Sequence, residues 1–188
     1  MEFHLARDSS ALFAALTLIA VLIAPAALAQ DSNTAKAHAL VEAAIKMTDS
    51  NAAVKLLWQA TDIDPAGDEA YVYLGEYYNS RSDPENVVKV YQKFVKNKPH
   101  QVAGYLNIGE AYLSFSPPRT DDALAWFHKA YALEPTNSFA ALRIGEVLMQ
   151  QGSRDEAAKY LRIAMADRSH NPSVSAEAEH DLKSLGAL

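Results

Sequence analysis

The sequence has no cysteine among its 188 residues. Without a thiol, the chain cannot form a disulfide, use a cysteine nucleophile, or hold zinc or an iron–sulfur cluster through sulfur. Basic residues are also few, because 17 Lys and Arg stand against 23 Asp and Glu, which gives a net charge of −6. Proteins bind phosphate backbones through clustered Lys and Arg, so this balance argues against a nucleic-acid-binding protein.

The sequence also lacks the motifs of common enzymes. Its seven glycines form no phosphate-binding loop, and neither a Gly-X-Ser-X-Gly nor a His-Glu-X-X-His motif is present. Glu177 and His180 have the spacing of half a di-iron ligand set, but such a site needs a second pair and further carboxylates. We therefore expect a protein that is not an enzyme and needs no cofactor or metal.

Residues 1–29 are typical of a secretory signal peptide. An almost unbroken apolar run over 11–29 ends in Ala27-Leu28-Ala29, which predicts cleavage after Ala29. Glu2 and Asp8 depart from the usual positive charge before such a run, and the run is just long enough to span a bilayer. An uncleaved inner-membrane anchor is therefore the alternative, and it would be the only membrane contact. In both cases we expect the chain to be exported. The lack of cysteine and of glycosylation sequons favours a bacterial periplasm.

A stretch of eight residues occurs three times at an almost constant interval. Residues 71–78 recur as 105–112 and 141–148, so that glycines fall 34 and then 36 residues apart. A degenerate copy surrounds Glu42, 34 residues before Glu76. Each copy precedes a second stretch with apolar residues at three- and four-residue spacing, which predicts two amphipathic helices per copy. The turns that follow contain Pro65, Pro99 and Pro135.

Local signals for helix ends support this pattern. Asp83 before Pro84 predicts a helix N-cap, and Ser153 with Glu156 predicts a capping box after a left-handed Gly152. A glycine inside a helix costs about 1 kcal/mol relative to alanine. Three of them at one equivalent position therefore predict a close approach of the paired helix.

This pattern resembles the tetratricopeptide repeat family, whose unit is a helix–turn–helix of about 34 residues. The resemblance implies an all-α fold, a right-handed α-solenoid of four repeats over 34–67, 68–101, 102–137 and 138–171. A C-terminal capping helix over 172–188 would cover the last repeat. The residues that match the family signature are Leu74, Gly75, Tyr78, Ile108, Gly109, Tyr112, Ala123, Ile144, Gly145 and Ala157, together with the three prolines.

The resemblance also implies a non-catalytic protein–protein interaction module, an adaptor or scaffold whose concave groove binds a peptide segment of a partner. Carboxylates at one position in all four repeats suit a basic peptide. Stacked helices lie about 8 to 10 Å apart, too far for one calcium ion with ligands at about 2.3 to 2.6 Å. The family's carboxylate clamp needs Lys, Arg and Asn where this chain has Glu, which argues against an acidic chaperone tail. The predicted groove residues are Glu42, Tyr73, Glu76, Asn107, Glu110, Arg143 and Glu146.

Several alternatives stay open at this point. Glu42 can pair with Lys46 and Glu146 with Arg143 within their own helices. Glu76 and Glu110 lack such a partner and could bridge to an adjacent repeat as framework residues. The third repeat is two residues longer than the second, and its insertion within 114–120 is either a tolerated loop or a contact loop. Finally, the protein could be a self-assembling scaffold that forms homo-oligomers through its terminal repeats.

Overall fold

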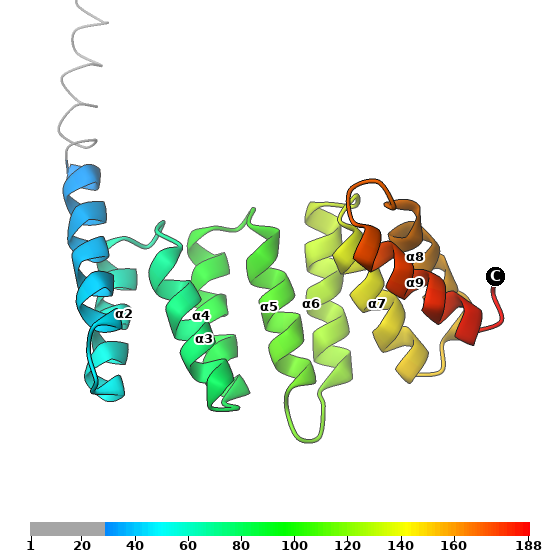
Figure 1. Ribbon diagram of the computed structural model, residues 1–188, viewed down its shortest axis with the longest axis horizontal. Helices are drawn as coiled ribbons and strands as arrows, with labels where there is room; N and C mark the ends of the chain where they lie inside the picture. Colours follow the sequence, from blue (N-terminus) through cyan, green and yellow to red (C-terminus); the bar gives the residue numbers. More distant parts are fainter. Residues whose placement is uncertain (1–28) are drawn as a thin grey trace, which may run out of the picture. The chain divides into compact units, whose positions relative to one another are not determined.

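The computed structural model describes residues 29–188 (Figure 1). The predicted signal peptide lies outside the described residues except for Ala29. The described chain contains helices and no strand, and none of its helices is both long and apolar enough to cross a membrane. The chain divides into two compact units, Met1–Ala70 and Tyr71–Leu188, which we call unit 1 and unit 2.

The described part of unit 1 is a helical hairpin. A helix over residues 29–45 is followed by α2 (Ser50–Ile63). The Asp49 carboxylate caps α2, because it accepts hydrogen bonds from the backbone N–H groups of Asn51 at 2.9 Å and Ala52 at 3.2 Å. Val41, Leu57 and other buried apolar side chains form the interior of the hairpin.

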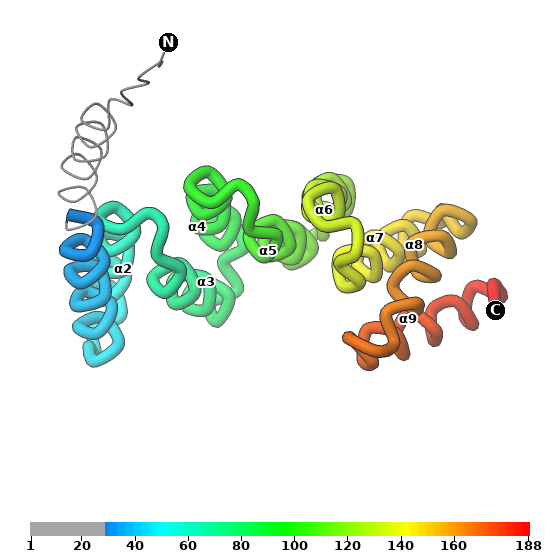
Figure 2. The backbone as a smooth tube through the Cα atoms, turned by 90° about the horizontal axis from the view of Figure 1, so that it is seen from above, coloured from blue at the N-terminus to red at the C-terminus, as the bar shows by residue number. Residues whose placement is uncertain are grey.

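Unit 2 contains the other helices, which follow one another as antiparallel neighbours (Figures 1 and 2). Every helix from α4 to α8 packs against the next one in the chain, and α7 also packs against α9. The predicted all-α solenoid of helix pairs with a terminal capping helix is therefore confirmed, while the boundaries of the repeats remain a prediction. The helices are α3 (Glu69–Ser80), which begins two residues before unit 2, α4 (Pro84–Asn97), α5 (Val102–Leu113), α6 (Thr120–Leu133), α7 (Ser138–Gln150), α8 (Arg154–Ala166) and α9 (Pro172–Ser184).

The three signature glycines lie where paired helices approach one another closely. A Cβ atom on Gly109 would stand 2.7 Å from Cδ1 of Phe127, and one on Gly145 would stand 2.7 Å from Cδ2 of Leu161. The predicted close approach is confirmed, because the large residue of the second helix occupies the space that a side chain would need. We call these contacts the glycine seam, which consists of Gly75 with Tyr91, Gly109 with Phe127 and Gly145 with Leu161.

The predicted helix ends are partly confirmed. Asp83 accepts a hydrogen bond from the N–H of Asn86 at 3.1 Å, and Gly152 has a left-handed φ of 79°. The capping box at Ser153 is wrong, since its side chain makes no cap hydrogen bond. The Glu156 half of the box is blocked as well, because the Ser153 N–H that Glu156 would have to reach already donates to Leu148 O at 2.9 Å in the turn that closes α7.

The last helix covers the end of the array. Ala178 and Leu182 of α9 are fully buried and belong to one apolar cluster with Leu161 of α8. Arg154 donates to Leu185 O and Arg162 to Ala187 O, both at 2.9 Å, so α8 also holds the chain end. These contacts give α9 the capping position that the apolar spacing after residue 172 predicts.

Candidate functional site

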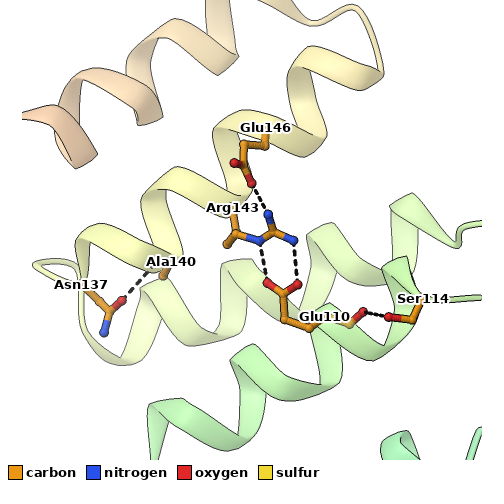
Figure 3. Close-up of polar contacts among 6 residues, drawn as sticks. All are labelled: Glu110, Ser114, Asn137, Ala140, Arg143 and Glu146. Carbon is orange, nitrogen blue, oxygen red and sulfur yellow. Dashed lines mark hydrogen bonds and ion pairs between the residues drawn. The ribbon is translucent and has the colours of Figure 1, made fainter. Parts of the chain in front are cut away.

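Arg143 joins two carboxylates of unit 2 (Figure 3). Its Nε donates to Glu110 Oε1 at 2.5 Å and its Nη2 donates to Glu110 Oε2 at 2.6 Å, while its Nη1 donates to Glu146. The exposed fractions of the Arg143, Glu110 and Glu146 side chains are 22%, 38% and 17%. The guanidinium therefore has hydrogen bonds on all three of its nitrogens and is largely withdrawn from water.

Helix geometry brings these three residues together. Glu146 follows Arg143 by three residues on α7, which places both on one face of the helix. Glu110 comes from α5, in the preceding helix pair. The start of α7 is fixed by Asn137, whose side chain accepts from the N–H of Ala140 at 2.9 Å (Figure 3). The interaction is thus a contact between repeats and not within one helix.

Burial and ion pairing shift the pKa values of Arg143 and Glu146 in opposite directions. Burial works to lower the pKa of Arg143, but the hydrogen bonds and charges of Glu110 and Glu146 outweigh it and raise that pKa. Burial raises the pKa of Glu146, and Glu177 and Asp181 of α9 raise it further although Arg143 opposes them. Negative charge therefore exceeds positive charge on this surface. We call it the acidic surface, and it consists of Glu110, Arg143, Glu146, Glu177 and Asp181.

The other predicted groove residues form no hydrogen bond or ion pair with this cluster in the described part of the chain. Glu42 belongs to unit 1 and forms an ion pair with Lys46 Nζ at 2.7 Å. This is the pairing within one helix that the sequence offers as an alternative to ligand binding. Glu76 is exposed on α3 and forms no ion pair with any residue that the structure describes. Asn107 donates from Nδ2 to Ala103 O in its own helix at 2.9 Å, and Tyr73 is half-buried on α3.

The four equivalent carboxylates therefore do not share one environment. Glu110 bridges to the adjacent repeat, which is the framework alternative that the sequence left open, whereas Glu42 and Glu146 pair within their own helices. The structure therefore does not contain a row of four unpaired carboxylates at this repeat position. Among the described residues, no group of three or more acidic or histidine side chains could hold a metal ion.

The insertion in the third helix pair is packed against its own neighbours. Phe115 stacks on Tyr112 with ring centroids 5.7 Å apart. The Arg119 guanidinium carbon lies 4.7 Å from the Tyr112 ring centroid and 5.3 Å from that of Phe115, and Arg119 pairs with Asp122 at 2.7 Å. These contacts favour a tolerated loop over a contact loop for a partner, because Phe115 already packs against Tyr112 and Arg119.

Sequence reasoning missed three residues that the structure places in important contacts. Glu177 and Asp181 fall within the predicted capping helix, and no sequence signal reveals that this helix adjoins Glu146. The third residue is Gly104, which allows α5 to pack closely on α4. A Cβ there would stand 2.5 Å from Val95 Cγ1 and 2.6 Å from Phe94 Cδ1. Its signal was available, since it is another glycine inside a predicted helix.

Comparison with known proteins supports one family. The sequence profile of the tetratricopeptide repeat family matches residues 119–177, and the solved structures that resemble this chain include tetratricopeptide repeat proteins. Residues 119–177 therefore match the tetratricopeptide repeat (TPR) family. The profile match covers α6 to α8 and the start of α9, which includes Arg143, Glu146 and Glu177.

Solved structures share the fold of this chain at low sequence identity. The MamA protein is 18% identical with a TM-score of 0.62, covering 84% of this chain and 85% of its own. A thermophilic TPR protein from Thermus thermophilus is 20% identical with a TM-score of 0.58, covering 80% and 84%. The TPR2B domain of yeast Sti1, solved as a complex with pHsp70, is 24% identical with a TM-score of 0.50, covering 60% and 96%. No curated protein matches the sequence.

Proposed function

We propose that this protein is a non-catalytic interaction module whose acidic surface binds a basic segment of a partner protein. The TPR family in general serves protein interaction and not catalysis, and the structural relatives include a Sti1 domain in complex with pHsp70. The observation that carries the proposal is the excess of carboxylates around a single, fully engaged arginine.

The state of Arg143 favours a basic ligand over an acidic one. Its three nitrogens already donate to Glu110 and Glu146, so an incoming carboxylate would have to displace both. Glu177 and Asp181 form no ion pair within the described residues, and they add negative charge beside Glu146. A Lys or Arg side chain can therefore approach α9 without breaking an existing pair.

The test uses a labelled alternating Lys-Ala peptide as the probe. The double variant Glu177→Gln/Asp181→Asn should bind it several-fold more weakly and with a flatter salt dependence, because two attracting charges are gone. The matched control is Asp155→Asn/Glu156→Gln, which removes the same charge from exposed positions at the start of α8. Circular dichroism melts check that both variants fold. Equal binding by the two variants would refute the acidic surface as the binding site.

We also propose that the protein acts outside the cytoplasm, most simply in a bacterial periplasm. The support is the apolar run over residues 11–29 with small residues at its end. N-terminal sequencing of the protein from an envelope fraction should give Gln30 as the first residue. An intact Met1 in the membrane fraction would favour the anchored alternative, and an intact Met1 in the cytoplasm would contradict export.

Homo-oligomerisation through the last helix has little support from the structure. The exposed residues of α9 include Glu177, His180 and Lys183, and polar faces of this kind end repeat arrays in solution. We expect a monomer by light scattering. A mass that rises with concentration would instead favour the scaffold alternative.

A further inference from the structure

Unit 1 contains a pocket that shares no residue with the acidic surface. Its volume is about 260 Å³, and the buried residues Ala37, Val41, Ala60 and Ala70 contribute to its lining. Most of the exposed pocket wall is therefore apolar. The same pocket is also lined by Asp64, which ends α2.

Asp64 is a buried carboxylate that no cation neutralises. It is 5% exposed. Its Oδ2 accepts from Thr34 Oγ1 at 2.8 Å, and its Oδ1 accepts from Ala66 N at 3.2 Å and Gln30 Nε2 at 3.3 Å. All three donors are neutral, and no described Lys, Arg or His pairs with it. Because a buried charge without an opposite charge is unfavourable, a cation that reaches Asp64 gains a strong interaction.

The pocket leaves one side of this carboxylate open. A carboxylate offers about four acceptor positions, of which Asp64 uses three. Gly67 lines the pocket, and a Cβ on it would stand 3.1 Å from Asp64 Oδ2. The backbone of Gly67 is not in the left-handed region, so the turn itself does not require glycine. Its missing side chain instead keeps space beside Oδ2.

Asp167 at the end of α8 is a counterpart with different surroundings, since it lines a pocket of about 340 Å³ together with His170 and Asn171. Like Asp64 it accepts from a hydroxyl at the start of the preceding helix of its pair, here Ser138 Oγ at 2.7 Å. It also accepts from Asn171 Nδ2 at 3.2 Å and contacts His170 Nδ1 at 2.9 Å. Asp167 therefore also has three partners, but one of them is an imidazole that can carry a positive charge, whereas all three donors to Asp64 are neutral.

We propose that the pocket of unit 1 binds the side chain of one lysine or arginine of a partner protein. The small apolar lining accommodates the methylene stem, and the open position of Asp64 Oδ2 receives the charged group. His38 and Glu69 line the pocket as well and already pair at 2.9 Å, so Asp64 is the carboxylate without a cation. This assignment does not depend on the proposed role of the acidic surface.

The test is an NMR titration of the full protein at neutral pH with n-butylammonium, which mimics the lysine side chain. The backbone amides of Ala66 and Gly67 should shift saturably. The neutral analogue n-butanol should bind at least about tenfold more weakly, a difference of about 1.4 kcal/mol for the lost charge.

Three variants distinguish this site from general attraction to an acidic protein. Asp64→Asn keeps the shape and should lose the binding, Gly67→Ala should weaken it by narrowing the approach to Oδ2, and Asp167→Asn should leave it unchanged. If Asp64→Asn does not fold, the butanol comparison and Gly67→Ala still decide. Equal binding of butanol, or saturable binding that survives Asp64→Asn, would overturn the proposal without bearing on the acidic surface.

Discussion

Gly109 and Glu110 are consecutive residues of α5, yet they belong to two surfaces with different origins. Gly109 contacts Phe127 of α6 in the glycine seam, and Glu110 contacts Arg143 of α7 on the acidic surface. The seam repeats in three helix pairs because each pair packs in the same way. The acidic surface exists only where the repeats differ, since the position of Arg143 holds Tyr73 and Asn107 in the two preceding copies. The repeated residues thus form the framework. Arg143, at a position where the repeats differ, links Glu110 and Glu146 into the candidate site.

The largest expected effect comes from filling the glycine seam. Gly109→Val places a branched side chain where Phe127 Cδ1 lies 2.7 Å from the new Cβ position. Because Phe127 is fully buried and cannot move outward, we expect the free energy of unfolding to fall by about 3 kcal/mol or more. The measurement is urea denaturation followed by circular dichroism.

The control for this variant is Ala103→Val, an exposed position on the same helix. It should cost about 0.7 kcal/mol or less, the difference in helix propensity alone. If the two valine variants had similar stability, close packing at the seam would not explain the repeated glycine.

An intermediate effect is expected for the ion pairs of the acidic surface. Arg143→Met keeps an aliphatic stem but leaves Glu110 and Glu146 without their cation, and should lower stability by about 1 to 2 kcal/mol. The matched surface change Arg168→Met breaks a pair whose arginine is 68% exposed and should cost about 0.5 kcal/mol or less. A double-mutant cycle with Glu110→Gln should show coupling at Arg143. Additive effects there would mean that the two repeats are not linked through this pair.

The smallest expected effects are on the pH dependence of stability. They have opposite signs for Asp167 and Glu146. Hydrogen bonds from Ser138 and Asn171, with the nearby His170, hold the pKa of Asp167 below its ordinary value. Asp167 therefore stabilises the fold above the ordinary aspartate pKa, and this contribution disappears as the pH falls through the lowered one. The melting temperatures of wild type and Asp167→Asn should differ at neutral pH and converge in acid. A difference that persists at low pH would contradict this assignment.

Glu146 supplies the opposite case. Burial raises its pKa, so the folded state takes up its proton more readily than the unfolded chain. As the pH falls through this raised pKa, wild type should gain stability relative to Glu146→Gln. Melting curves of both proteins across the acidic range measure this trend, and a loss relative to the variant would show that the pair with Arg143 dominates over burial.

The framework was predictable from the sequence because its signals are local and repeated. Spacing of Gly75, Gly109 and Gly145 was enough to place the helix pairs, and Asp83 with Pro84 marked a helix start. The capping box at Ser153 failed because two motifs compete for one N–H group, which only the turn geometry resolves. In the candidate site, Glu110, Arg143 and Glu146 could be named from their repeat positions. Glu177, Asp181 and the surroundings of Asp64 could not, because they depend on packing between segments distant in sequence.

The most direct test of the central claim is to map where a basic ligand binds. Backbone amide shifts of the protein, followed by NMR during titration with the alternating Lys-Ala peptide, report each helix separately. If the acidic surface binds the peptide, saturable shifts should concentrate on α5, α7 and α9 around Glu110, Glu146, Glu177 and Asp181. Shifts concentrated on α4, α6 and α8, or no saturable shift in unit 2, would contradict it.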